Sequence, residues 1–159
     1  MPVIKLITWI DAPIERVFDL SRSIDLHTNS TSSTGERAIA GVTSGLIGSG
    51  EEVTWRAKHF GVWQSLSVRV TAYERPFHFA DAMVRGAFHR MEHQHHFSKQ
   101  GTATEMQDMF SFEAPFWILG RIAESMFLTN YMRSFLVQRN QVLKATAESD
   151  DWKKYLESA

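Results

Sequence analysis

The chain has 159 residues, which is long enough for one domain with a substantial buried core. Its 17 basic and 18 acidic residues nearly cancel, which removes the main sequence argument for a basic face that binds nucleic acid, and we expect no nucleic-acid partner. The chain contains no cysteine, which excludes a disulfide scaffold, a thiolate metal site and a cysteine nucleophile.

The composition, 43% hydrophobic and 22% charged, is typical of an ordinary globular protein. No apolar run reaches the roughly 20 residues that span a bilayer. The first residues, MPVIKLITWIDAP, lack the charged region and the continuous apolar run of a secretory signal. We therefore expect no integral membrane segment and, by default, a cytoplasmic location.

The N-terminal part of the chain predicts one strand followed by short helices. Residues 3–10 are rich in side chains that favour strands, and Asp11 and Pro13 then suit the cap and the first turn of a helix. Apolar positions between residues 14 and 26 predict one or two short helices. The polar segment 27–35, HTNSTSSTG, predicts a loop.

Residues 36–113 predict an antiparallel sheet. After a short strand at 36–41, the glycine-rich stretch 43–50 leads into another strand and lacks the Gly-Lys-Ser/Thr ending of a phosphate-binding loop, so it is interpreted as a hairpin connection. From residue 51 onward, apolar and polar side chains alternate with a period of two. Turn residues separate the strands at Gly61, Pro76, Gly86 and Gly101.

The spacing of apolar residues changes to that of a helix after Pro115. Apolar side chains then recur three and four positions apart up to about Ala147, which predicts one long helix with a wide apolar side. The sequence shows no repeat and no composition shift that would mark a second domain. We therefore expect a single domain over residues 1–147 and a C-terminal tail over residues 148–159.

Several short motifs accompany this order of elements. They are Ala12-Pro13-Ile14-Glu15-Arg16-Val17-Phe18, Gly41-Val42-Thr43-Ser44-Gly45 leading to Gly50-Glu51-Glu52-Val53-Thr54-Trp55, His93-x-His95-x-Phe97, Thr104-x-Met106-x-Asp108 and Pro115-x-x-x-Leu119-Gly120. Over roughly residues 1–147 the chain resembles the START and Bet v 1-like (SRPBCC) superfamily. Within it, the chain is most similar to the bacterial polyketide cyclase/dehydrase-like branch of stand-alone ligand-binding domains.

The resemblance implies an α+β architecture called a helix-grip fold. In this fold a curved antiparallel sheet of about seven strands wraps around a long C-terminal helix, and two short helices follow the first strand. The family implies a deep cavity between sheet and helix that holds lipids, sterols, aromatic polyketides or other apolar molecules. Some members catalyse cyclisation or dehydration in that cavity.

Three of the seven histidines fall within four consecutive positions, in the stretch MEHQHHF. Because side chains on a strand alternate, His93 and His95 point to one face and His96 to the other. The face that carries His96 is polar throughout, so His93 and His95 are expected to point inward. A hairpin turn near residues 99–102 would place His93 opposite Asp108 on the next strand.

The same alternation places two further polar side chains inside the sheet. The expected polar group of the cavity is His59, Asp81, His93, His95 and Asp108. The expected apolar lining is Trp55, Phe79, Phe110, Met126 and Phe135. Each buried polar group left unpaired costs about 1–3 kcal/mol, so these groups must pair with one another, with water, with a ligand or with a metal ion.

Three interpretations of the histidines remain open. In the first, His93 and Asp108 bond only to each other, and His95 bonds to water or a neighbour. In the second, the group orients the polar end of a ligand. In the third, it does chemistry, with His93 as a general base that Asp108 orients. As a metal site instead, His93 and His95 would bind zinc or iron, with Asp81 or His59 as the third ligand.

Residues and resemblance together favour a protein without a cofactor that binds a small apolar or amphipathic molecule by its polar end. The alternative is an enzyme of the aromatase/cyclase or dehydratase type that uses His93 and Asp108 as an acid–base pair. A further alternative is a lipid-delivery or protein-interaction module. In that case Trp63, Phe116 and Trp117 would mark a cavity mouth or a homodimer contact.

Overall fold

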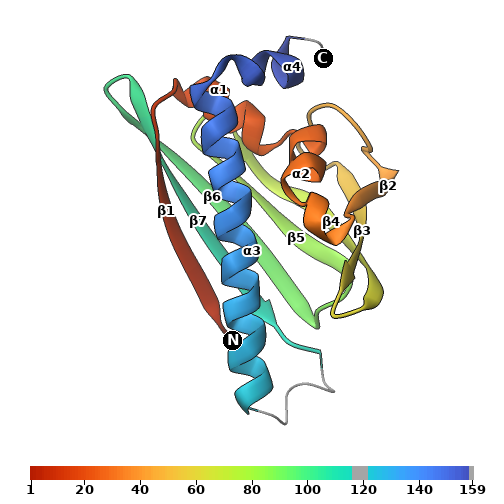
Figure 1. Cartoon of the computed structure of the whole chain (residues 1–159). Helices are drawn as coiled ribbons and strands as arrows, with labels where there is room; N and C mark the ends of the chain where they lie inside the picture. The colour runs from red at the N-terminus through yellow and green to blue at the C-terminus, as the bar shows by residue number, and fades with distance from the viewer. Residues whose placement is uncertain (116–121, 158–159) are drawn as a thin grey trace.

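The computed structural model describes residues 1–115 and 122–157, and its main feature is one curved sheet around one long helix (Figure 1). Within these residues the strands are β1 (Val3–Ile10), β2 (Arg37–Gly41), β3 (Glu52–His59), β4 (Val62–Glu74), β5 (His78–Gly86), β6 (Arg90–Gln100) and β7 (Ala103–Glu113). The helices are α1 (Ile14–Ser21), α2 (Ile24–Ser30), α3 (Ile122–Glu148) and α4 (Lys153–Leu156), with the 3-10 turns η1 (Ser32–Thr34) and η2 (Asp150–Trp152).

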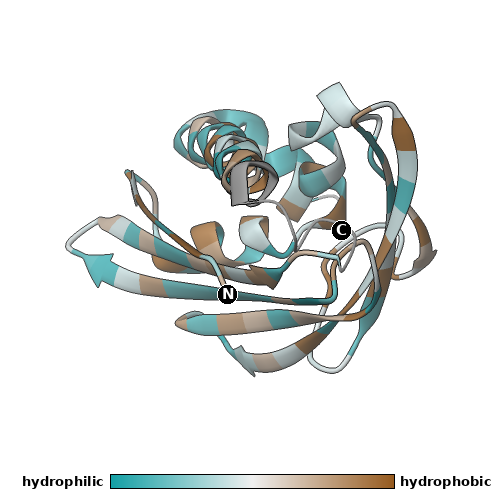
Figure 2. Ribbon diagram, turned by 90° about the horizontal axis from the view of Figure 1, so that it is seen from below, coloured by the Kyte–Doolittle hydropathy of each residue, from teal (hydrophilic) through white to brown (hydrophobic). Residues whose placement is uncertain are grey.

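The strands form one antiparallel sheet in the order β1-β7-β6-β5-β4-β3-β2. Strands β2 to β6 each pair with the next strand along the chain, and β1 pairs with the remaining edge of β7. The sheet curves around α3, which lies on its concave side (Figure 2). The predicted helix-grip fold, with two short helices after the first strand, is therefore confirmed.

Helix α1 joins the sheet to α3 through its apolar side. Phe18 on this side is fully buried, and its ring meets those of Tyr73, Phe79 and Phe97 with centroids 5.3 to 5.5 Å apart. All three contacts are edge-on, which is the arrangement that aromatic pairs prefer over a face-to-face sandwich. The helix is thereby held over β4, β5 and β6.

Helix α2 continues to Ser30, so the prediction of a loop over residues 27–35 is wrong for its first part. Ser23 caps the helix by accepting the backbone N–H three residues on, at 3.2 Å. Thr28 Oγ1 donates to the carbonyl of Ile24 at 3.0 Å. Because such a hydroxyl can bond to the carbonyl one turn earlier, a segment rich in serine and threonine can remain helical.

The β6–β7 hairpin pairs His95 with Asp108 and His93 with Phe110, so the predicted pairing of His93 with Asp108 is wrong by two residues. The two strands stay paired up to a two-residue turn that begins at Gly101, where φ is 62°. Glycine adopts this left-handed conformation without steric cost, so the turn is shorter than predicted. A shift of two residues leaves every side chain on its predicted face.

The interior contains two hydrophobic clusters that divide along α3. Around the C-terminal half of the helix, Leu143 and Ala147 pack among residues of α1 and the sheet. Around the N-terminal half, Leu128 and Leu136 pack against the larger cluster, whose other members come mainly from the strands. The larger cluster, around Leu128 and Leu136, borders the cavity described below.

The C-terminal residues 149–157 form η2 and α4 and pack against α1 and α2. The Arg16 guanidinium lies 4.3 Å from the ring centroid of Trp152, and Asn29 Nδ2 donates to Tyr155 Oη at 3.1 Å. That residues 1–147 form the folding unit stays a prediction. None of the helices in the described part of the chain is long and apolar enough to cross a membrane. A cytoplasmic location stays a prediction.

Candidate functional site

A cavity of about 210 Å³ lies between the sheet, α2 and α3. Most of its lining residues are apolar, and they come from widely separated parts of the chain. The four aromatic residues predicted to line it all do so, namely Trp55, Phe79, Phe110 and Phe135. The alternation of side chains along the strands therefore identified the inner face of the sheet correctly.

The prediction that Met126 lines the cavity is wrong, because its side chain is 63% exposed. On α3 the cavity instead meets Leu128, Met132 and Leu136, which recur at intervals of four residues. Met126 precedes Leu128 by two residues, which is roughly 200° around a helix. The apolar side of α3 is wide in the sequence, so only the packing shows which part of it faces the sheet.

The deep polar cluster consists of Asp81, His93, His95 and Asp108, on the neighbouring strands β5, β6 and β7. Asp108 Oδ1 lies 2.9 Å from His93 Nε2 and 2.9 Å from His95 Nδ1. The contact with His93 is a hydrogen bond, whereas His95 Nδ1 lies off the axis of a hydrogen bond and interacts by charge. Asn140 on α3 donates from Nδ2 to the other Asp108 oxygen at 2.7 Å.

Asp108 lies behind the two imidazole rings, with none of its surface exposed. Asp81, His93 and His95 reach the cavity wall, but Asp108 does not. The predicted hydrogen bond between His93 and Asp108 is confirmed. The expectation that Asp108 itself holds a ligand is wrong, because it can act only through the histidines.

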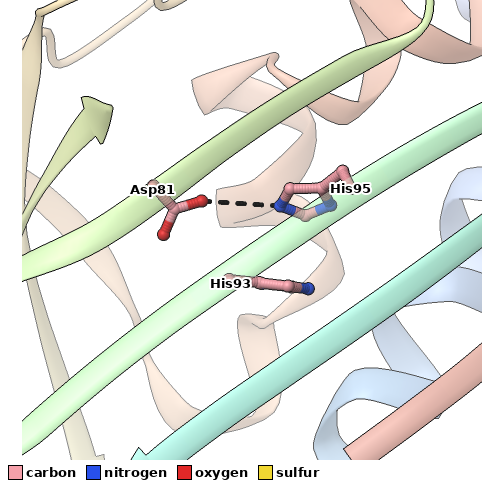
Figure 3. Close-up of side chains that lie close together, drawn as sticks. All are labelled: Asp81, His93 and His95. Atoms are coloured by element: carbon pink, nitrogen blue, oxygen red, sulfur yellow. Dashed lines mark ion pairs between the residues drawn. The ribbon is translucent and has the colours of Figure 1, made fainter. Parts of the chain in front are cut away.

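Asp81 faces His95 from the adjacent strand, with Oδ2 3.4 Å from Nε2 (Figure 3). The His95 ring lies between two other rings, with its centroid 4.2 Å from that of Phe79 and 3.8 Å from that of His93. One ligand atom from each of Asp81, His93 and His95 lies within 4.8 Å of the others. These three side chains could together hold a metal ion.

Neither a family model nor a curated protein matches the sequence. Solved structures match most of it. The TTHA0849 protein from Thermus thermophilus is 17% identical, with a TM-score of 0.70 over 92% of this chain and 99% of that chain. A START superfamily protein from Mycobacterium smegmatis is 10% identical, with a TM-score of 0.70 over 92% and 97% of the two chains. The ginseng major latex-like protein 151 from Panax ginseng is 15% identical, with a TM-score of 0.62 over 92% and 99%.

The chain has the START and Bet v 1-like fold. This confirms the family resemblance at the level of the fold, which is what identities this low show. The narrower assignment to the polyketide cyclase/dehydrase-like branch stays a prediction.

Burial and neighbouring charges shift the pKa values of the deep polar cluster in this START-like fold, and for Asp108 and His95 the two effects oppose each other. Burial alone would raise the pKa of Asp108, but the hydrogen bond of His93 and the close contact of His95 outweigh it and hold that pKa well below its usual value. Burial would lower the pKa of His95, but Asp108 and Asp81 outweigh it and raise that pKa. Burial and the charge of His95 lower the pKa of His93 to about 4. The pKa values of the two imidazoles are therefore shifted in opposite directions.

A second polar cluster, His27, Glu36, His59 and Tyr131, lines another part of the cavity. His27 Nε2 bonds to the buried carboxylate of Glu36, and the His27 ring lies 4.1 Å from that of Trp55. His59 Nδ1 lies 2.6 Å from Tyr131 Oη. Burial lowers the pKa of His59. Only His59 of this cluster was predicted, because nothing in the spacing of the others connects them.

Arg139 is a cavity residue that the sequence analysis missed. Its side chain is only 7% exposed, and Nη1 lies 3.3 Å from Asn140 Oδ1 and 3.8 Å from Asp108 Oδ1. In the sequence, Arg139 interrupts the apolar side of the long helix three residues after Leu136. A cation on the apolar side of a helix is the signal that could have identified it, because arginine is almost never fully buried unless it is paired.

Proposed function

We propose that the protein binds a small, mostly apolar molecule that carries a polar group. The observation that carries this proposal is the cavity of about 210 Å³, with apolar walls and a few convergent polar groups. Protein interiors are packed with few voids larger than a water molecule, so a space of this size is unusual unless something fills it. Apolar pockets with a few placed polar groups are the usual form of a small-molecule site.

The size of the cavity limits the ligand. An engineered cavity of about 150 Å³ in another protein holds benzene. By that comparison, the cavity here suits a molecule of about one or two rings. The aromatic side chains of Trp55, Phe79 and Phe110 in its wall would favour an aromatic ligand.

The polar groups define where such a ligand would be held. The deep polar cluster and Arg139 offer donors and acceptors at one part of the wall. The second polar cluster offers a phenol and an imidazole at another. A ligand with oxygen atoms at two separate positions would satisfy both, which distinguishes it from a simple hydrocarbon.

Native mass spectrometry of the gently purified protein tests the proposal. An organic adduct that leaves on denaturation would support it and would identify the ligand. The protein without an adduct should still bind an apolar fluorescent probe such as anilinonaphthalene sulfonate. A protein that carries no adduct and binds no such probe would contradict the proposal.

A second proposal is an enzyme of the aromatase/cyclase or dehydratase type. The hydrogen bond between His93 and Asp108, with His93 on the cavity wall, favours this candidate. A carboxylate partner orients an imidazole for proton transfer to or from a bound substrate. Turnover of keto or polyphenolic compounds that disappears in a His93→Gln variant would support the enzyme. A screen that finds no turnover above the rate of this variant would count against it.

A third proposal, a lipid-delivery or interaction module, rests on exposed aromatic residues. Trp63 is 51% exposed, and Phe60 and Phe127 are also exposed, with their ring centroids 5.6 Å apart. Phe60 borders the cavity as well. The predicted partners Phe116 and Trp117 lie outside the described residues. Co-sedimentation with liposomes and the mass in solution test delivery and homodimer formation, respectively.

A further inference from the structure

We propose that Asp81, His93 and His95 form a binding site for one divalent transition-metal ion, such as zinc or iron(II), in the wall of the cavity. This inference goes beyond the binding of an organic molecule, because the site would bind its ion whether or not the apolar part of the cavity is filled. The two nitrogen donors and one carboxylate come from the adjacent strands β5 and β6.

The distances between the donor atoms fit a shared ion. The three atoms lie within 4.8 Å of one another. Asp81 Oδ2 and His95 Nε2 are 3.4 Å apart, which is long for a charge-assisted hydrogen bond of about 2.7–2.9 Å. Two ligands bound at about 2.1 Å to a tetrahedral ion lie about 3.4 Å apart. For all three donors to bind one ion they must move closer together, because 4.8 Å exceeds the separation of two ligands on one ion.

The groups behind the donors match the outer layer of a metal site. A histidine that binds a metal usually gives its other ring nitrogen to a carboxylate, which sets the tautomer and the orientation of the ring. Asp108 Oδ1 lies 2.9 Å from one nitrogen of His93 and 2.9 Å from one nitrogen of His95. Asn140 in turn holds Asp108 by a hydrogen bond of 2.7 Å. The His95 nitrogen away from Asp108 is the one that faces Asp81.

The type of ligand and the position of the site indicate the class of ion. Imidazole with carboxylate suits zinc, iron and related ions, and two histidines with one carboxylate leave positions open for another ligand. All three side chains line the cavity, so the open positions would face it. With both imidazoles neutral, as ligands must be, the carboxylates of Asp81 and Asp108 outnumber the single guanidinium of Arg139, which favours a cation.

The test is titration of the chelator-treated protein with Co²⁺, followed by the visible absorption of the ion, and then competition with Zn²⁺. We expect one Co²⁺ to bind per chain and zinc to displace it. The His95→Ala and Asp81→Asn variants should lose this binding. Asp108→Asn should weaken it about 10- to 100-fold, because Asp108 only orients the ligands.

The matched control is His96→Ala, on the same strand but on the outer face. His96 stacks on His78 with centroids 4.4 Å apart, so this outer pair is the obvious place for adventitious binding. Binding that persists in His96→Ala and is lost in Asp81→Asn, with an unchanged thermal transition, supports the proposal. Binding that survives in both Asp81→Asn and His95→Ala, or is lost in His96→Ala, overturns it, as does wild-type protein that binds no Co²⁺.

The same samples separate this inference from the proposed function. Binding of the apolar probe is measured in chelator, where no metal is present. Probe binding without cobalt binding would leave the ligand cavity in place and overturn only the metal site. Cobalt binding without probe binding would support the metal site and count against the proposed ligand cavity.

Discussion

Asp108 is the residue on which the deep polar cluster depends. It is a fully buried carboxylate that contacts both histidines and is held by Asn140 from the long helix. A buried charge is tolerated only when it is paired and hydrogen-bonded, so these contacts are also a condition of folding. The imidazoles in front of it are thereby fixed in position at the cavity wall.

At this scale we predict that His95→Leu weakens binding of the apolar probe or the native ligand by about tenfold, which corresponds to the loss of one hydrogen bond of about 1.4 kcal/mol. Asp108 keeps His93 and Asn140 as partners, so the variant should still fold. Fluorescence titration measures the affinity. His96→Leu, on the outer face of the same strand, is the control and should bind normally. Equal affinity in both variants would remove His95 from the site.

Two contacts at the scale of elements tie the helices to the rest of the domain. Arg75, which directly follows β4, donates from Nε and Nη2 to the two oxygens of Asp19 on α1, at 3.1 and 2.7 Å. Arg22 adds a third hydrogen bond to the same carboxylate, at 3.0 Å. At the other end of the chain, Trp152 covers Arg16. Each contact joins parts that are distant in sequence.

The Asp19 contact predicts a dependence of stability on pH. Burial alone would raise the pKa of Asp19, but the hydrogen bonds and charges of Arg75 and Arg22 outweigh it and lower that pKa below 3.8. A lowered pKa in the folded state contributes stability above pH 3.8, and this contribution is lost as the pH falls further. The free energy of unfolding should therefore fall more between pH 5 and pH 3 in the wild type than in Asp19→Asn. Urea denaturation at several pH values measures this, and parallel curves would contradict the prediction.

Removal of the C-terminal tail should lower the stability of the protein without changing its binding cavity. A chain that ends at residue 148 should keep the fold and the apolar cavity, because no tail residue that the structure describes lies in the cavity wall. It should melt at a lower temperature, since Trp152 and Tyr155 no longer cover α1 and α2. Trp152→Ala should show part of the same loss. Failure of the shortened chain to fold would show that the domain extends beyond residue 147.

The cavity is a property of the whole molecule. Its wall takes side chains from α2, α3 and most strands of the sheet, and no two neighbouring segments would form it alone. It lies along the N-terminal half of α3, whereas the C-terminal half is packed against α1. The fold thus combines one closely packed end, which supplies stability, with one hollow end that can accept a ligand.

A larger side chain placed in the cavity tests whether one end of the domain is hollow and the other closely packed. Ala57 lines the cavity, so Ala57→Phe should have room and should change the free energy of unfolding by less than about 1 kcal/mol while it abolishes binding of the apolar probe. The control is Ala147→Phe, at a fully buried position in the packed cluster, where overpacking should cost about 1–3 kcal/mol. Thermal and chemical denaturation compare the two. A large loss of stability in Ala57→Phe would indicate that the cavity is smaller than described.

Part of the candidate site could be predicted from the sequence. That His93, His95 and Asp81 line one cavity could be predicted, because strands alternate with a period of two. The pairing of His27 with Glu36 could not be predicted, because it depends on how α2 packs beside β2. Met126 was misplaced for a related reason, since the sequence of a wide apolar helix does not say which part meets the sheet.

Local sequence patterns were enough to predict the order of the elements, the inner face of each strand and hence the class of fold. These features depend on short-range periodicity, which a stretch of ten residues already contains. The register of the β6–β7 hairpin, the rotation of α3, and the contacts of Arg139 and Glu36 depend on how the chain packs. A shift of two residues leaves the pattern of faces unchanged, and contacts between distant elements arise only when the chain packs, so local periodicity carries no information about either.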